Sequence, residues 1–106
     1  RLERVKSPGI LHPHYRPTAA VHLLESTSAP AADPTKTAFC GLEPIPNVED
    51  LAYVELYDSL DDYAAGYYEF LREADRRAIP NILVQAAPAD GIGRALLDRQ
   101  RRSAAG

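Results

Sequence analysis

The apolar positions divide most of the chain into alternating strand-like and helix-like segments. Three short runs, 19–24, 37–42 and 51–57, are rich in aliphatic, branched or aromatic residues and lie between stretches rich in Pro, Asp, Ser and Gly. This pattern predicts three buried strands. A fourth strand is predicted at 81–85, where the sequence reads Asn-Ile-Leu-Val-Gln directly after Pro80.

The strongest helical periodicity lies between the third and fourth strands. Ser59 is a candidate N-cap, and the acidic Asp61 and Asp62 follow in the first turn, where the helix dipole favours them. Pro80 marks the predicted end, and a last helix is expected at about 92–103. Steps of three and four residues separate the apolar positions of the first helix: Leu60, Tyr63, Ala64, Tyr67, Leu71, Ala74 and Ala78.

This order of elements predicts a small α/β domain of Rossmann-like type at 18–106, with four or five mostly parallel strands and flanking helices. Continuous apolar strands are typical of a sheet covered on both faces, and the unit at 51–85 is expected to be a right-handed parallel crossover. The loop at 26–36 is too short for a helical crossover, which leaves an unusual connection or one antiparallel pair. An extended proline-rich arm, 1–17, precedes the domain.

Composition narrows the function classes. The chain has 106 residues and a net charge of −3, and it contains no Met and begins at Arg1, so we expect a piece of a longer or processed protein. No apolar stretch approaches the roughly 20 residues that span a membrane. The single Cys40 excludes an intramolecular disulfide and is consistent with a cytoplasmic location. The mild acidity argues against direct nucleic-acid binding.

The glycine pair of Gly91-Ile92-Gly93 is the best candidate for a small-molecule site. It is expected between a strand and a helix, where backbone amides can hold a phosphate. The full GxGxxG pattern is absent, because Ala95 and Leu96 follow. The alternative interpretation is a tight strand-to-helix turn capped by Asp90.

The other chemical candidates do not form an active site. His12, His14 and His22 lack the further ligands that a metal site needs, so no metal is expected. Cys40 lies within an apolar run and is interpreted as a buried structural thiol. Asp61 and Asp62 point to different sides of a helix and do not form an acid–base pair. We therefore expect no catalytic residues in this chain.

Three segments of the chain carry longer residue patterns. The arm, from Ser7-Pro8-Gly9 to His14-Tyr15-Arg16-Pro17, is similar to the pattern Ser-Pro-Gly-Met-x-x-x-His-Tyr-x-Pro. The first predicted helix carries Ala64, Tyr67, Tyr68, Leu71, Arg72 and Asp75, and the chain ends with Asp90-Gly91-Ile92-Gly93-x-Ala95-x-x-Asp98-Arg99. Together these segments resemble the interdomain linker and the C-terminal domain of the two-domain L-threonylcarbamoyladenylate synthases, which carry a YrdC-type catalytic domain.

The resemblance implies an accessory domain of an enzyme that condenses threonine, bicarbonate and ATP, a step toward threonylcarbamoyladenosine in tRNA. The parent enzyme would use ATP and Mg²⁺ in its YrdC-type domain, and this chain would hold no cofactor. The linker would act as a lid that excludes water from reactive intermediates. The residues implied as lid and ATP-site contacts are Ser7, Pro8, Gly9, His14, Tyr15, Arg16 and Pro17.

The arm departs from the family pattern at Ile10, which replaces Met, and at Leu11, His12 and Pro13. Any phosphate contact that the family makes at those positions would have to be made here by Arg16, Lys6 or Arg4 instead. Two further hypotheses stay open: an autonomous nucleotide-binding module that uses the Gly91–Gly93 turn, and an interaction domain with an acidic helix face. A homodimer is a further option.

Overall fold

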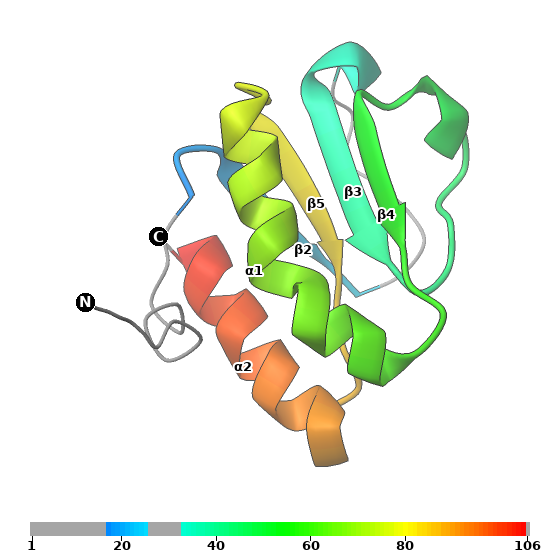
Figure 1. The fold of residues 1–106 in the computed structure, drawn as a ribbon, viewed down its shortest axis with the longest axis vertical. Helices are drawn as coiled ribbons and strands as arrows, with labels where there is room; N and C mark the ends of the chain where they lie inside the picture. Colours follow the sequence, from blue (N-terminus) through cyan, green and yellow to red (C-terminus); the bar gives the residue numbers. More distant parts are fainter. Residues whose placement is uncertain (1–16, 26–32, 106) are drawn as a thin grey trace, which may run out of the picture.

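The computed structural model describes residues 17–25 and 33–105. These residues form an α/β fold in which two α-helices pack on a four-stranded sheet (Figure 1). The predicted α/β class is confirmed. The strands and helices are β2 (Ala20–Leu24), β3 (Thr37–Gly41), β4 (Tyr53–Leu56), α1 (Leu60–Arg76), β5 (Asn81–Gln85) and α2 (Gly91–Ala105), with short 3-10 turns η2 (Pro34–Lys36) and η3 (Val48–Asp50).

The sheet has the strand order β2-β5-β3-β4, and all three of its pairs are parallel. β5 pairs with β2 from Ala20 opposite Asn81 and with β3 from Thr37 opposite the same residue. The sequence left open an antiparallel pair between the first two strands, and the structure excludes it: β2 and β3 are not neighbours, because β5 lies between them. All four strands therefore begin at one edge of the sheet, which we call the amino edge, and end at the other, the carboxyl edge.

Helix α1 begins where the capping signal predicted. The Ser59 Oγ accepts a hydrogen bond from the Asp62 amide at 3.1 Å. The helix ends at Arg76, so Ala78, counted among its periodic positions, is an exposed residue beyond the helix, with a φ of 57°. Its sheet-facing side buries Tyr63, Tyr67, Phe70, Leu71 and Ala74.

Both α-helices cover the same face of the sheet (Figure 1). They pack against alternate strand residues such as Val21, Cys40 and Val84. On the opposite face a smaller apolar cluster joins Leu24, Phe39 and Leu83 to the β3–β4 connection through Ile45, with Val48, Leu51 and Val54 beside it. Among the described residues, helices cover one face of the sheet and a loop covers the other. The expectation that both faces are covered is therefore met.

Candidate functional site

The residues implied as lid contacts, Ser7, Pro8, Gly9, His14, Tyr15 and Arg16, lie outside the described residues. Pro17 is the first described residue and is half-buried. The structure therefore describes the arm only where it joins the domain, and that junction has a defined geometry.

Three successive backbone amides are bound where the arm meets the domain. The Thr18 amide donates to both carboxylate oxygens of Asp75 at 3.1 Å, and the Ala19 amide donates to Asp75 Oδ1 at 3.4 Å. The Ala20 amide donates to the carbonyl of Pro80 at 2.9 Å. We call these contacts the arm root. Asp75 comes from the last turn of α1 and Pro80 from the turn before β5, so the corner between these elements holds the start of β2.

The α1–β5 corner is itself closed by backbone hydrogen bonds. The Ala78 amide donates to the Asp75 carbonyl at 2.9 Å, and the Ile79 amide donates to the Ala74 carbonyl at 3.1 Å. These two bonds, with the left-handed φ of Ala78, form a Schellman motif. A hollow of about 340 Å³ lies at this corner, lined by Thr18, Ala19, Asp75, Ala78, Ile79 and Pro80. These hydrogen bonds therefore hold the backbone that carries the Asp75 side chain.

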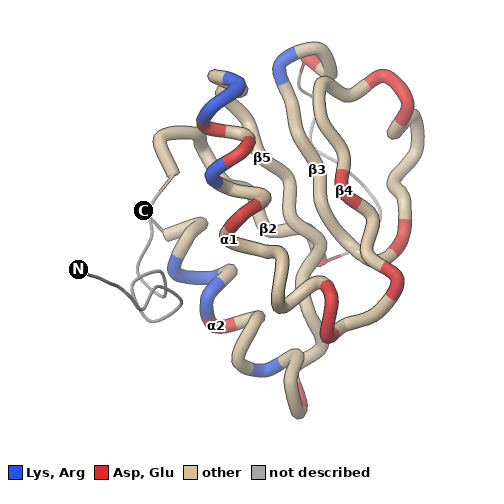
Figure 2. Tube along the Cα trace, in the orientation of Figure 1, with Lys and Arg blue, Asp and Glu red and all other residues tan. Residues whose placement is uncertain are grey.

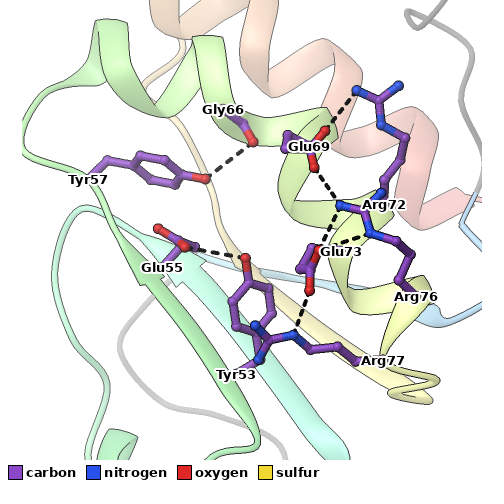
Figure 3. Close-up of polar contacts among 9 residues, drawn as sticks. All are labelled: Tyr53, Glu55, Tyr57, Gly66, Glu69, Arg72, Glu73, Arg76 and Arg77. Carbon is purple, nitrogen blue, oxygen red and sulfur yellow. Dashed lines mark hydrogen bonds and ion pairs between the residues drawn. The ribbon is translucent and has the colours of Figure 1, made fainter.

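A ladder of ion pairs covers the exposed side of α1 next to the corner (Figure 3). Glu69 pairs with Arg72 at 3.0 Å and with Arg76 at 2.6 Å. Glu73 pairs with Arg76 at 2.6 Å and with Arg77 at 2.8 Å. Hydrogen bonds from these arginines hold the pKa of both glutamates below its usual range. Because the ladder is solvent-exposed, it orders the helix surface more than it stabilises the fold.

The ladder continues onto β4 through an aromatic stack. The guanidinium of Arg77 lies 4.1 Å from the ring centroid of Tyr53, whose ring stacks on Phe70 at 5.2 Å. The Tyr53 hydroxyl donates to Glu55 at 3.3 Å (Figure 3). Burial, with the adjacent Glu55 carboxylate, raises the pKa of Tyr53 to about 12. The stack therefore links the C-terminal end of α1 to β4.

Polar side chains in the core join the two helices to the carboxyl edge. The buried amide of Gln100, from α2, donates to the Tyr63 hydroxyl at 2.9 Å and to the Gln85 carbonyl at 3.0 Å, and its oxygen accepts from the Ala87 amide at 2.9 Å. Cys40 is fully buried beside Tyr63, with its Sγ 3.8 Å from the hydroxyl. Burial raises the pKa of the Cys40 thiol well above its ordinary value. The interpretation of Cys40 as a buried thiol is therefore confirmed.

Gly91, Ile92 and Gly93 are the first three residues of α2, so the glycine pair follows β5 and opens a helix, as expected. Gly91 has a left-handed φ of 57°, and a Cβ at Gly93 would overlap the carbonyl oxygen of Pro88. Both glycines thus have a structural reason to be there. A hollow beside the turn includes Arg94, Asp98 and Arg101 in its lining. A phosphate at this turn stays a prediction.

Carboxylates dominate the sequence next to the carboxyl edge (Figure 2). Asp58 follows β4 and Asp90 precedes α2, whereas the arginines of α2 lie along that helix. The acidic residues at or just beyond this edge are Glu25, Glu43, Asp58, Asp61, Asp62 and Asp90. The negative charge of these residues disfavours a phosphate near the carboxyl edge. Arg94 is the basic residue closest in sequence to the glycine pair.

The described residues contain no group of three or more His, Cys, Asp or Glu arranged to hold a metal ion. His22 is exposed on β2, whereas His12 and His14 lie outside the described residues. Within residues 17–25 and 33–105, no helix combines the length and apolar character needed to cross a membrane.

Comparison with known families decides what this domain is. The chain matches the family model of the threonylcarbamoyl-AMP synthase C-terminal domain over residues 1–105. The chain belongs to this family. No curated protein and no solved structure matches it. The match confirms the resemblance inferred from the sequence, and it covers residues 1–16 as well as the described domain.

The helix motif of this synthase domain has a clear structural division. Tyr67 and Leu71 are fully buried, and Ala64 packs beside them. Tyr68, Arg72 and Asp75 are half-buried and lie at helical spacings of four and three residues, on one side of α1. Sequence reasoning matched Asp75 to the family without giving it a role. It missed Gln100 altogether, although the spacing of Gln100 from Leu96 and Leu97 places it on the buried side of α2.

Proposed function

We propose that this chain is the accessory domain of a threonylcarbamoyl-AMP synthase and carries the arm that closes over the ATP site of the catalytic domain. The parent reaction joins threonine, bicarbonate and ATP and releases pyrophosphate, as the family resemblance implies. The observation that carries the proposal is the match over residues 1–105, which includes both the arm and the α/β domain.

The domain's geometry supports a carrier role. The arm root at Thr18 is bound to a corner that is closed by its own hydrogen bonds, so the domain offers a firm base for a lid. A lid that closes over a mixed anhydride excludes water and orders the substrates. Within the arm, His14 and Tyr15 match the family pattern and have side chains that can donate hydrogen bonds to a nucleotide.

We also propose that the chain is noncatalytic by itself. Its one thiol, Cys40, is buried with a raised pKa, which is unfavourable for a nucleophile. The catalytic groups, ATP and Mg²⁺ would belong to the YrdC-type domain of the same synthase. The isolated chain should therefore release no pyrophosphate from ATP, and measurable turnover would contradict this part of the proposal.

The lid proposal is tested in the intact synthase by Tyr15→Ala, with His12→Ala as the matched control. Both residues lie in the arm, but Tyr15 matches the family pattern and His12 departs from it. Tyr15→Ala should lower the yield of threonylcarbamoyl-AMP per pyrophosphate released and raise the KM for ATP, whereas His12→Ala should behave like the wild type. Wild-type turnover and yield in Tyr15→Ala would exclude the lid role.

A further inference from the structure

The junction between β5 and α2 contains the one Asp-Gly pair of the sequence, Asp90-Gly91, and the sequence has no Asn-Gly pair. Both residues are exposed. In the described part of the chain, no hydrogen bond or ion pair engages the Asp90 carboxylate, whereas Asp75 and Asp98 are bound through theirs. Asp90 therefore presents an unbound carboxyl group directly before the backbone amide of a glycine.

The backbone nitrogen of Gly91 is open on the side where a side chain would lie. Gly91 is the first residue of α2, so its N–H has no acceptor within the helix. It has a φ of 57°, and a Cβ at this position would meet no atom within 4 Å. Any other residue type would place a side chain beside this nitrogen, whereas glycine leaves the approach clear. The carboxyl carbon of Asp90 can therefore come close to the nitrogen of its neighbour.

We propose that Asp90-Gly91 is a modification site at which Asp90 isomerises to isoaspartate in the folded protein. The Gly91 nitrogen attacks Cγ of the protonated Asp90 carboxyl group, and an N–Cγ bond forms. One carboxyl oxygen leaves as water with the carboxyl proton and the amide proton, which gives a cyclic succinimide. Water then adds to the ring: breakage of the N–Cγ bond restores aspartate, and breakage of the bond from nitrogen to the main-chain carbonyl carbon gives isoaspartate.

Isoaspartate at this position would open the first turn of α2. The Asp90 carbonyl accepts a hydrogen bond from the Arg94 amide at 3.2 Å. In isoaspartate the main chain runs through Cγ, so the backbone gains one carbon and the former carbonyl becomes a free carboxylate. The helix start cannot shift to absorb this carbon, because Gly93 already lies so close to Pro88 that a Cβ would overlap the Pro88 carbonyl oxygen. The damage should end before Leu96, which is fully buried.

The experiment incubates the full chain, folded and in urea, in buffer made with heavy-oxygen water, and locates incorporated oxygen and isoaspartate by peptide mass spectrometry. Asp58 is the matched comparison, because it is exposed and directly precedes the Ser59 cap of α1. In the folded chain, Asp90 should take up several times more heavy oxygen than Asp58. Gly91→Ala, which adds a side chain beside the nitrogen, should lower this uptake severalfold, and Asp58→Glu should leave it unchanged.

Equal uptake at Asp58 and Asp90 in the folded chain would overturn the proposal. Uptake at Asp90 in urea but not in the folded chain would overturn it as well, because the fold would then protect the site. Should Gly91→Ala not fold, Asp90→Glu decides, since its longer side chain cannot form the succinimide and uptake at this position should be lost.

The opening of α2 has its own measurement. Amide hydrogen exchange of a peptide spanning residues 91–97 should become faster as isoaspartate accumulates, whereas Asp90→Glu should keep its initial exchange rate over the same incubation. Isoaspartate at Asp90 without faster exchange in this peptide would exclude the opening of the helix.

Discussion

The hydroxyl of Tyr63 accepts a hydrogen bond from the Gln100 amide at 2.9 Å and donates one to the Gln85 carbonyl at 2.6 Å, so one phenol joins both helices to the end of the central strand β5. Both side chains are fully buried. Polar groups of this kind are costly to bury without partners, and here each polar atom has one.

Removal of the Tyr63 hydroxyl should therefore destabilise the domain. Tyr63→Phe leaves the Gln85 carbonyl and the Gln100 amide with fewer partners, and we expect a loss of about 1–2 kcal/mol in the free energy of unfolding. Urea denaturation measures it. Tyr57→Phe is the matched control, because the half-exposed Tyr57 hydroxyl makes a longer bond, 3.3 Å, to the Gly66 carbonyl (Figure 3). Equal effects of the two variants would contradict this view of the core.

Gln100 should be less replaceable than its neighbours on α2. Gln100→Leu is close in volume but leaves the buried Ala87 amide without its acceptor, for an expected cost of about 2–3 kcal/mol. Leu97→Met, a conservative change at a nearby buried site, should cost less than about 1.5 kcal/mol. A stable Gln100→Leu variant would show that the side-chain network contributes little.

The helix end at Ala78 offers a stabilising substitution. Ala78 has a φ of 57° and is exposed, and glycine adopts this conformation without strain. Ala78→Gly should raise the free energy of unfolding by about 1 kcal/mol. Ala65→Gly, an exposed site within α1, should lower it by a similar amount, because glycine disfavours a helix interior. A destabilised Ala78→Gly would be inconsistent with the Schellman motif.

Substitutions at the two glycines in the first turn of α2 can distinguish a structural role from a ligand-binding role. Gly93→Ala places a Cβ against the Pro88 carbonyl oxygen and should destabilise by about 1–3 kcal/mol. Gly91→Ala meets open space and should cost about 1 kcal/mol through its φ alone. If the turn binds a nucleotide, Gly91→Val should weaken ATP binding to the chain in a calorimetric titration; unchanged binding excludes that site.

The tyrosines should make the domain sensitive to alkaline pH. Burial raises the pKa of Tyr53 to about 12, above the ordinary value of 10.0. A raised folded-state pKa favours the neutral phenol, so this stabilisation is complete below about pH 10 and is lost as the pH rises through 10 toward 12. The melting temperature should fall over that window, and Tyr53→Phe should flatten the fall. A profile unchanged by Tyr53→Phe would show that other groups govern it.

The sequence predicted the elements well because their signals are local. The Ser59 cap, the period of α1 and the apolar run at 81–85 each depend on neighbouring residues, and the structure has them at Leu60–Arg76 and Asn81–Gln85. Strand order could not be read in the same way. The position of β5 between β2 and β3 depends on pairings across more than forty residues, for which one sequence carries no local signal.

The candidate site was predictable only in outline. The family patterns drew attention to Asp75, but its partners are backbone amides of Thr18 and Ala19, which carry no side-chain signature. A main-chain donor does not depend on residue type. The sequence can therefore indicate the acceptor, Asp75, but not the residues that donate to it. The arm residues Ser7 to Arg16 lie outside the described part of the chain, and their role stays a prediction.

The arm root also has a mechanical consequence. β2 lies along β5 at the border of the described sheet, and the chain enters it through Thr18, Ala19 and Ala20 in turn. Tension applied through the arm is therefore carried first by the Asp75 carboxylate and then by the Pro80 carbonyl, before it loads the β2–β5 ladder. These contacts shield the β2–β5 ladder at the junction, so a force on the chain before Thr18 would meet two groups of hydrogen bonds before it could shift the register of the sheet.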